Sequence, residues 1–448
     1  MTSLFQDFKP VSSKEWKQKI QFDLKGADYQ TLLTHTIEKI DIKPFYHLDS
    51  YHPFENVDNG NSKIVQFGRI NDENIANKIA KNALNKGADY YSFSFDRVFH
   101  IESVIQNLDF DKLIFKSNIL DVDFISELYG KTLGEAQILL DPIGHFSHYG
   151  NWYTNEKTDF DQLKKLQNTF PADYKFIGIG VDIYKNAGAS VTQELAYALS
   201  HAVEYIEKLD ISVANRIQFN FAIGNHYFFE IAKFKVFRYL WQLILDEYGV
   251  NADIVIHAQP SIRNKTVFDS YINMLRTGIE MMSAILGGVD FVGNLPFDSV
   301  YKKTNEFSER IAKNQLLVLK EEAYLKKASN SFEGTYYLEN ISGQIAEKAL
   351  EIFKQIEKGN GFLAQLYKEK IQEKIAETAN HTQNGFDKGK VVLVGSNKYI
   401  NESEKPEKIE IYPFLRKRSG QTLVRPIVSK RLAEEIEIKR LNKLGIKF

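Results

Sequence analysis

The stretch "RIQFNFAIGNHYFFEIAKFKVFRYLWQLILDEYGVNADIVIHAQ", residues 216–259, carries the pattern that decides the fold prediction. It begins with a short apolar run (216–224), continues through a long helix-like segment (227–248) and returns to a second apolar run (252–259). Short continuous runs rich in β-branched and aromatic residues are typical of parallel strands that are buried on both faces. The stretch therefore predicts one strand–helix–strand unit of a parallel sheet.

The same alternation recurs on both sides of this stretch. Further strands are predicted at residues 88–96, 112–118, 138–144, 176–184 and 289–297, with a weaker eighth strand near "ASNSF" (328–332). Eight strand–helix units at this spacing favour an α/β fold of the (β/α)8 TIM-barrel type. A doubly wound sheet would need a glycine-rich phosphate loop after its first strand, and "SFSFDRVFH" (92–100) contains no glycine.

Two segments flank the predicted barrel, which is assigned to residues 61–360. Residues 1–60 are predicted to form an N-terminal arm and linker at a subunit interface. Residues 361–448 are predicted to form a C-terminal extension with a helix, a short strand "KVVLVGSN" (390–397) and a basic amphipathic ending.

The arm carries an apolar stripe, because Trp16, Ile20 and Leu24 recur at helical spacing. A barrel already covered by its own helices has little apolar surface left to receive this stripe. The arm is therefore predicted to wrap a partner subunit, and truncation of residues 1–30 is expected to weaken assembly more than it destabilises the barrel.

Composition excludes several classes of protein. The 57 basic and 58 acidic residues give a net charge of −1, so nothing in the bulk charge favours nucleic acid or an anionic membrane. The absence of cysteine excludes disulfides, thiolate catalysis and cysteine-ligated zinc. The N-terminus lacks the apolar core of a signal peptide, and no apolar run reaches the ~18 residues of a membrane span. A soluble cytoplasmic protein is expected.

In a barrel of this kind, functional side chains sit at the C-terminal ends of the strands. The candidates at the predicted strand ends are Asp96, Asp141, Asp182, Asn225, His257, Gln259 and Asn294. No lysine ends a predicted strand, so a Schiff base is not expected. The two histidines of "HFSH" (145–148) follow a Pro-Ile-Gly turn in a predicted loop, so no metal site is expected there. Gly178 and Gly180 fall inside a strand and indicate close packing.

His257 has two interpretations on the residues alone. The first is a histidine at the barrel rim that hydrogen-bonds a neighbouring loop. The second is an imidazole that polarises a carbonyl group with the help of Gln259.

The segment "HAQPSIRNKTVFDSYINMLRTGIEMMSAILGGVDFV" (257–292) resembles the sixth strand and following helix of the methylmalonyl-CoA mutase barrel. In that family a His-x-Gln opens the segment, and an Arg-Thr-x-Ile-Glu helix leads to a Gly-Gly. The matching positions are His257, Gln259, Arg276, Thr277, Ile279, Glu280, Gly287 and Gly288. "WKQKIQFDLKGADY" (16–29) is similar to the opening of the family's small, or beta, subunits. The resemblance covers nearly the whole chain and implies a TIM barrel.

The chain also departs from the catalytic members of that family. They carry Thr-Met-Tyr, Arg-Pro-Trp and Tyr-Ala-Gly-Phe before the first barrel strand, where the coenzyme A chain is threaded. Residues 51–81 contain none of these, and only "QFGRI" (66–70) keeps a trace. No arginine for the substrate carboxylate occurs in "VDIYKNAG" (181–188) or "FAIGNHYF" (221–228). The Asp-x-His-x-x-Gly motif, whose histidine ligates cobalt, does not occur in the chain.

The resemblance and the departures together predict a non-catalytic small subunit of a heterodimeric methylmalonyl-CoA mutase. Its large (alpha) subunit would hold adenosylcobalamin and isomerise methylmalonyl-CoA and succinyl-CoA. His257 and Gln259 would form a vestigial substrate pocket, with no catalytic residue, no metal and no tightly bound cofactor in this chain. The alternative is a catalytic acyl-CoA mutase barrel that uses a cobalamin domain on a separate chain. A barrel enzyme of unrelated chemistry would need an acid–base set that the sequence does not reveal.

Overall fold

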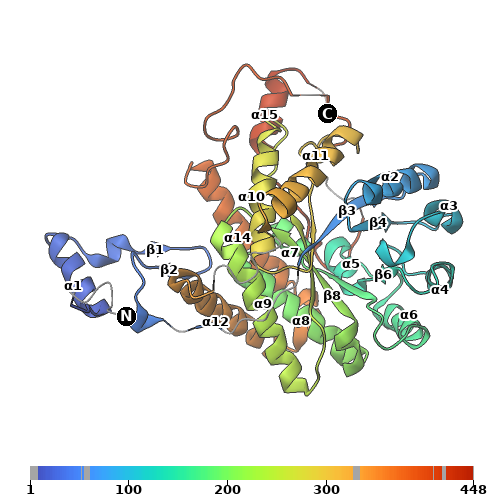
Figure 1. Ribbon diagram of the computed structural model, residues 1–448, viewed down its shortest axis with the longest axis horizontal. Helices are drawn as coiled ribbons and strands as arrows, with labels where there is room; N and C mark the ends of the chain where they lie inside the picture. The colour runs from blue at the N-terminus through green and yellow to red at the C-terminus, as the bar shows by residue number, and fades with distance from the viewer. Residues whose placement is uncertain are drawn as a thin grey trace.

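Eight parallel strands form a barrel in the middle of the chain, and helices surround it (Figure 1). The computed structural model describes residues 9–51, 53–54, 61–325, 333–406, 408–415 and 420–446. The barrel strands are β3 (Lys63–Arg69), β4 (Tyr90–Phe95), β5 (Leu113–Ser117), β6 (Gln137–Leu139), β7 (Ile177–Gly180), β8 (Ile217–Ile223), β9 (Val255–Pro260) and β10 (Phe291–Gly293). They pair in the order β6-β5-β4-β3-β10-β9-β8-β7, and a parallel bridge between Leu140 and Ile177 joins the ends of the sheet. The predicted barrel is confirmed.

Most of the helices after the strands cover the outside of the barrel. These covering helices are α2 (Glu73–Asn85), α3 (Ile101–Ile105), α4 (Val122–Lys131), α6 (Glu156–Thr169), α8 (Val191–Lys208), α9 (Tyr227–Tyr248), α10 (Ile272–Leu286), α11 (Glu306–Leu317) and α12 (Tyr336–Lys358). All residues of β8 are buried, because Phe219 and Phe221 pack against Phe237 and Trp241 of α9 on the outside. This two-sided burial explains the continuous apolar run in the sequence.

Glycine allows close contact between β6 and β7. A Cβ atom on Gly178 would lie 2.7 Å from the Cβ of Leu139, which is closer than such atoms approach in proteins. The prediction that this glycine-containing strand packs closely is confirmed at Gly178.

The first barrel strand is not the one that the sequence predicts. It is β3, and only Ile64 and Val65 of this strand are buried hydrophobic residues, because its last residues face a cavity. The predicted eighth strand near "ASNSF" lies outside the described residues. The predicted strand "KVVLVGSN" is wrong: the Asn397 side chain hydrogen-bonds the backbone of Phe386, Val391 and Leu393 and folds the segment into a turn.

Two predicted strands also end earlier than expected, and a short helix follows each. β6 ends at Leu139 because Asp141 caps α5 (Pro142–Tyr149), whose first residue is a proline. β7 ends at Gly180, and α7 (Asp182–Ala187) starts two residues later. These two helices bring polar side chains over the end of the barrel.

The N-terminal arm extends away from the barrel and carries α1 (Ser13–Asp23) at its far end (Figure 1). No residue of α1 is buried, and Trp16 stacks on Phe45 within the arm at 4.4 Å. The arm returns to the barrel through the hairpin of β1 (Thr34–His35) and β2 (Asp41–Ile42). In the turn of this hairpin, the Glu38 carboxylate accepts hydrogen bonds from the backbone of Val191 and Thr192 at the start of α8.

The C-terminal extension crosses the end of the barrel where the strands terminate. After α13 (Gly361–Tyr367) and α14 (Lys370–Asp387), the chain runs to α15 (Glu434–Lys443). On the way, the backbone of Ile427 donates to Ser147, that of Lys430 to Asn186, and that of Leu432 to Arg263. The extension thereby ties together the segments that follow β6, β7 and β9. Within the described ranges, no helix is both long and apolar enough to cross a membrane.

Candidate functional site

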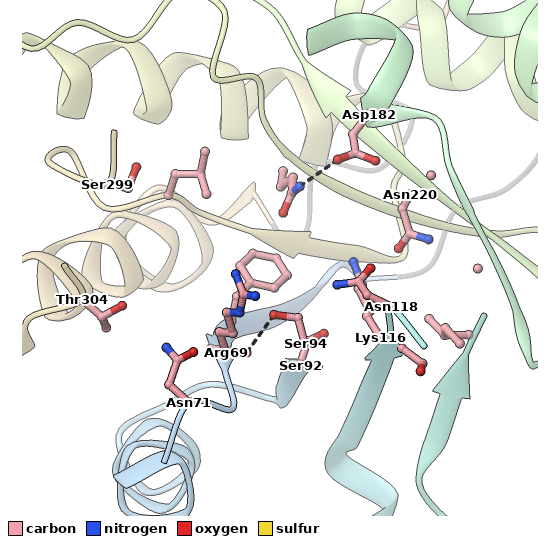
Figure 2. Close-up of a pocket in the computed structure, with 18 of the residues that line it drawn as sticks. Arg69, Asn71, Ser92, Ser94, Lys116, Asn118, Asp182, Asn220, Ser299 and Thr304 are labelled. Atoms are coloured by element: carbon pink, nitrogen blue, oxygen red, sulfur yellow. Dashed lines mark hydrogen bonds between the residues drawn. The ribbon is translucent and has the colours of Figure 1, made fainter. Parts of the chain in front are cut away.

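A cavity of about 1040 Å³ lies at the C-terminal end of the barrel. Its wall includes residues from β3, β4, β5, β8 and β9 and from the inserted helices α5 and α7. Close to its inner end, Lys116, Asn220 and Asp182 converge from β5, β8 and α7 (Figure 2). This is the position at which barrel enzymes place their active sites.

Lys116 and His257 form the central contact at the base of this cavity. The Nζ atom of Lys116 lies 3.2 Å from Nδ1 of His257, and Oδ1 of Asn220 lies 3.2 Å from the same nitrogen. The ring of Phe67 packs edge-on against the imidazole at 5.2 Å and lies 5.6 Å from Nζ of Lys116. The contact between Asn220 and His257 follows from the sheet, since these residues are direct partners in the register of the adjacent strands β8 and β9.

Burial changes the protonation of both groups. It lowers the pKa of Lys116 to about 8, although the Asp182 carboxylate partly offsets the effect. Burial and then the charge of Lys116 hold the pKa of His257 well below its usual value. The imidazole is therefore neutral at pH 7, and its Nδ1 atom contacts both Nζ of Lys116 and Oδ1 of Asn220. Nε2 has no hydrogen-bond partner in the described part of the chain.

His257 itself does not line the cavity. Phe67, Lys116 and Asn220, which all contact it, do line the cavity, and the histidine is 2% exposed. A molecule in the cavity would therefore contact Lys116, Phe67 and Asn220, which separate it from the imidazole.

Asp182 and Gln259 are the two predicted site residues that the structure brings together on the cavity wall. The Nε2 atom of Gln259 lies 3.5 Å from Oδ2 of Asp182 (Figure 2). Burial raises the pKa of Asp182, while the positive charge of Lys116 acts in the opposite direction.

Asp141 also lines the cavity, but its carboxylate is already fully used. It accepts hydrogen bonds from the backbone of Gly144 and Gly180 and from the Tyr205 hydroxyl, and its Oδ1 atom lies 3.0 Å from Nε2 of His201. Burial raises its pKa, but His201 and the donors outweigh this effect and hold the pKa below its usual value. The carboxylate joins β6, β7 and α8, which is a structural role.

The remaining predicted candidates do not assemble into a site. Asn294 lines the cavity, but its amide donates to the Ala312 carbonyl and contacts Gln315. Asp96 does not line the cavity and is paired with Arg69, which does. Asn225 is exposed in the segment before α9.

The two histidines of "HFSH" lie on helix α5, so the prediction of a loop there is wrong. Asp141 and the proline of the Pro-Ile-Gly sequence start this helix instead of a turn. His145 stacks on Tyr153 at 3.7 Å, and Nδ1 of His148 contacts the Ile427 carbonyl oxygen at 3.1 Å. A group of three or more His, Asp or Glu side chains that could hold a metal ion is absent from the described residues.

The sequence analysis missed two ionisable residues of the cavity. Lys116 is the penultimate residue of β5, so a search restricted to the last residue of each strand did not find it. The sequence signal for this residue was a lysine that directly follows the apolar residues 113–115 of "KLIFKSN". Glu309 of α11 hydrogen-bonds Gln66 of β3 at 2.9 Å, and burial raises its pKa to about 7. Nothing in the sequence marks Glu309, because α11 approaches β3 only in the folded chain.

Two residues of the Arg-Thr-x-Ile-Glu helix make contacts that hold neighbouring segments of the chain together. Arg276 donates to Thr266, Asn273 and the Val394 carbonyl, and so connects α10 to the C-terminal extension. Glu280 forms a buried ion pair with Lys265 at 2.8 Å.

A protein-family comparison places this barrel among known proteins. The family model described as Methylmalonyl-CoA mutase matches residues 135–438, which is more than half of the chain. The chain belongs to the methylmalonyl-CoA mutase family. The match includes β7–β10 and extends through the segment that crosses the barrel end.

Within the family, the chain is similar to small subunits over most of its length. A methylmalonyl-CoA mutase small subunit from Porphyromonas gingivalis (strain ATCC BAA-308 / W83) is 32% identical over 90% of this chain and 72% of that protein. A small subunit from Streptomyces virginiae is 30% identical over 61% of this chain and 46% of that protein. The methylmalonyl-CoA mutase large subunit from Porphyromonas gingivalis is 31% identical over 52% of this chain but only 34% of that protein.

Proposed function

We propose that this chain is the non-catalytic small subunit of a heterodimeric methylmalonyl-CoA mutase. The observation that carries the proposal is the covered position of His257. The family resemblance implies that the histidine at this position hydrogen-bonds the thioester carbonyl of the substrate in catalytic members, but here Phe67 and Lys116 line the cavity and His257 does not. The similarity to small subunits over most of the chain supports the same assignment.

The residues at the end of the barrel do not fit adenosylcobalamin. A cobalt ion would need an available imidazole, yet His145 is stacked on Tyr153 and His148 contacts the backbone of Ile427. The C-terminal extension also hydrogen-bonds the segments after β6, β7 and β9 at the face where such a cofactor would approach. The cofactor is therefore proposed to reside in the large subunit, and no chemical step is assigned to it in this chain.

The role of this chain would be to stabilise its partner through a large interface. Obligate interfaces bury roughly 2,000–5,000 Å² in total. The arm is the proposed contact, since α1 buries none of its residues and Trp16 and Phe22 are 42% and 77% exposed. The partner that fits is a methylmalonyl-CoA mutase large subunit, because Porphyromonas gingivalis has relatives of both names.

The test compares the purified chain with the reconstituted heterodimer. We expect the chain alone, with added adenosylcobalamin, to show no interconversion of methylmalonyl-CoA and succinyl-CoA, and the heterodimer to be active. Activity of the chain alone would refute the proposal. Activity with a stand-alone cobalamin-domain protein would instead support the catalytic-barrel alternative.

Substitution of His257 tests whether this residue takes part in catalysis by the heterodimer. In the reconstituted heterodimer, His257→Ala is expected to change turnover by less than about threefold, because under ~1 kcal/mol of the barrier depends on it. Gln259→Ala is the matched variant on the cavity wall, and size-exclusion chromatography confirms assembly. A hundredfold loss of turnover in an assembled His257→Ala complex would show that this barrel takes part in catalysis.

A further inference from the structure

Lys116 differs in its surroundings from other buried lysines of this chain. Lys185 and Lys233 pair with Glu194 and Glu230, and Lys265 pairs with Glu280. Lys116 instead contacts the neutral imidazole of His257 and the face of Phe67, and it forms no ion pair with a carboxylate among the described residues. A lysine without a paired carboxylate gives up its proton more readily when it is buried.

The same side chain is also accessible from the cavity. It is the penultimate residue of a barrel strand and lines the cavity of about 1040 Å³ described above. Hydroxyl and amide groups lie around it on the cavity wall, from Ser92, Asn118 and Asn220 (Figure 2). A reactive amine on a rigid strand, facing a cavity of a size suited to small molecules, has the geometry of a Schiff-base lysine.

We propose that Lys116 is a carbonyl-reactive amine and that this cavity takes a small hydroxylated aldehyde or ketone. The Nζ lone pair attacks the carbonyl carbon and forms a C–N bond, and a proton moves from nitrogen to the former carbonyl oxygen. Loss of that hydroxyl as water, together with the second proton of the nitrogen, then gives the imine, so the condensation needs no oxidant or reductant. The hydroxyls and amides of the wall hydrogen-bond the hydroxyl groups of the ligand. This site is independent of the subunit function proposed above, because it concerns only the chain's own cavity.

The ionisable neighbours of Lys116 support a free amine near neutral pH. They are His257 on β9, which is neutral, and Asp182 on α7, which favours the ammonium form. The strands β4, β6 and β8 present Ser92, Leu139 and Asn220 to the cavity, which carry no charge. With its pKa at about 8, Lys116 has a fraction of free amine at pH 7 that is on the order of a hundredfold larger than that of an ordinary lysine.

Reductive trapping tests the proposal on the full chain. The protein is incubated at pH 7 with glyceraldehyde, or with propanal as the probe without hydroxyls, together with sodium cyanoborohydride. Peptide mass spectrometry then measures alkylation of each lysine. Lys116 is expected to react at least tenfold faster than Lys112, which lies just before the same strand and is paired with Asp109 outside the cavity. Glyceraldehyde is expected to react with Lys116 faster than propanal does.

Variants and pH give independent controls. Lys116→Arg keeps the charge but forms no imine and abolishes the fast label, whereas Lys112→Met leaves it unchanged. The rate at Lys116 is expected to level off above about pH 8, while the rate at Lys112 continues to rise. Labelling of Lys116 no faster than that of Lys112 in the folded wild-type chain overturns the proposal, and this comparison requires no variant to fold. A faster reaction with propanal than with glyceraldehyde overturns the assigned ligand class.

Discussion

Removal of the first part of the N-terminal arm tests where this segment exerts its effect. Deletion of residues 1–27 takes away α1 but keeps Tyr29, which is buried, and Glu38, which binds the start of α8. We expect the deletion to leave the thermal unfolding of the isolated chain nearly unchanged and to weaken assembly with the large subunit by tenfold or more.

The expected magnitude follows from the contacts that α1 makes. The stack of Trp16 on Phe45 contributes roughly 0.5–1.5 kcal/mol, and the placement of Lys17 over Tyr29 about 0.5–1 kcal/mol. Both contacts lie within the arm, so their loss acts on the arm and not on the barrel. Even ~1 kcal/mol transmitted to the barrel would shift Tm by only roughly 2–4 °C.

Calorimetry of the isolated chain and titration of the large subunit measure the two effects separately. The matched control is a double substitution of Trp16 and Phe22 by alanine, which keeps the chain length and removes the exposed apolar side chains. A fall of ten degrees or more in Tm with unchanged assembly would show that α1 belongs to its own barrel.

Three further perturbations test the close packing at Gly178, the hydrogen bonds that Glu38 accepts from the start of α8, and the raised pKa of Glu309. Gly178→Ala places a Cβ 2.7 Å from that of Leu139 and is expected to lower the free energy of unfolding in urea by about 1–3 kcal/mol. The control Gly343→Ala has open space around it on α12 and should raise the free energy of unfolding by about 0.5–1 kcal/mol. Equal effects of the two substitutions would contradict the close packing of β6 and β7. Glu38→Ala removes the acceptors of the Val191 and Thr192 hydrogen bonds and is expected to lower the free energy of unfolding by ~2–4 kcal/mol, with Glu38→Gln intermediate. A loss below about 0.5 kcal/mol, on the order of an exposed surface change, would show that these hydrogen bonds do not hold the arm to α8. Burial raises the pKa of Glu309 to about 7, so this residue stabilises the folded chain fully below about pH 4.5, and the contribution is lost as pH rises through 7. Relative to Glu309→Gln, the free energy of unfolding of the wild type should fall by up to about 3 kcal/mol between pH 5 and 8. Parallel pH profiles of stability for the wild type and Glu309→Gln would contradict a buried, protonated Glu309.

The barrel could be predicted because its strands are buried on two sides and leave continuous apolar runs. β8, with every residue buried, is the clearest example. β3 escaped prediction because its second half faces the cavity, where Phe67 and Arg69 line the wall, so that only Ile64 and Val65 look like core residues. A strand that contributes to a site therefore carries a weaker signal than a strand that contributes only to packing.

The site could be predicted only where polar residues follow or close a predicted apolar run. Asp182 and Gln259 were found in this way and do share the cavity wall. Lys116 was missed because it lies inside a run, one residue before the strand ends, and Glu309 because a helix distant in the sequence delivers it. Their perturbed pKa values depend on burial, which sequence spacing does not report.

The residues of the family motif make structural contacts in this chain. Arg276 joins α10 to the C-terminal extension, and Glu280 neutralises a buried lysine, so substitution of either would leave unpaired buried groups. His257 packs edge-on against Phe67 and contacts Nζ of Lys116. Each of these side chains is fixed by folding in a way that does not depend on a substrate. Under the proposed function, a match to the motif reports the barrel alone, and the covered position of His257 is what sets this chain apart from a barrel that acts on a thioester.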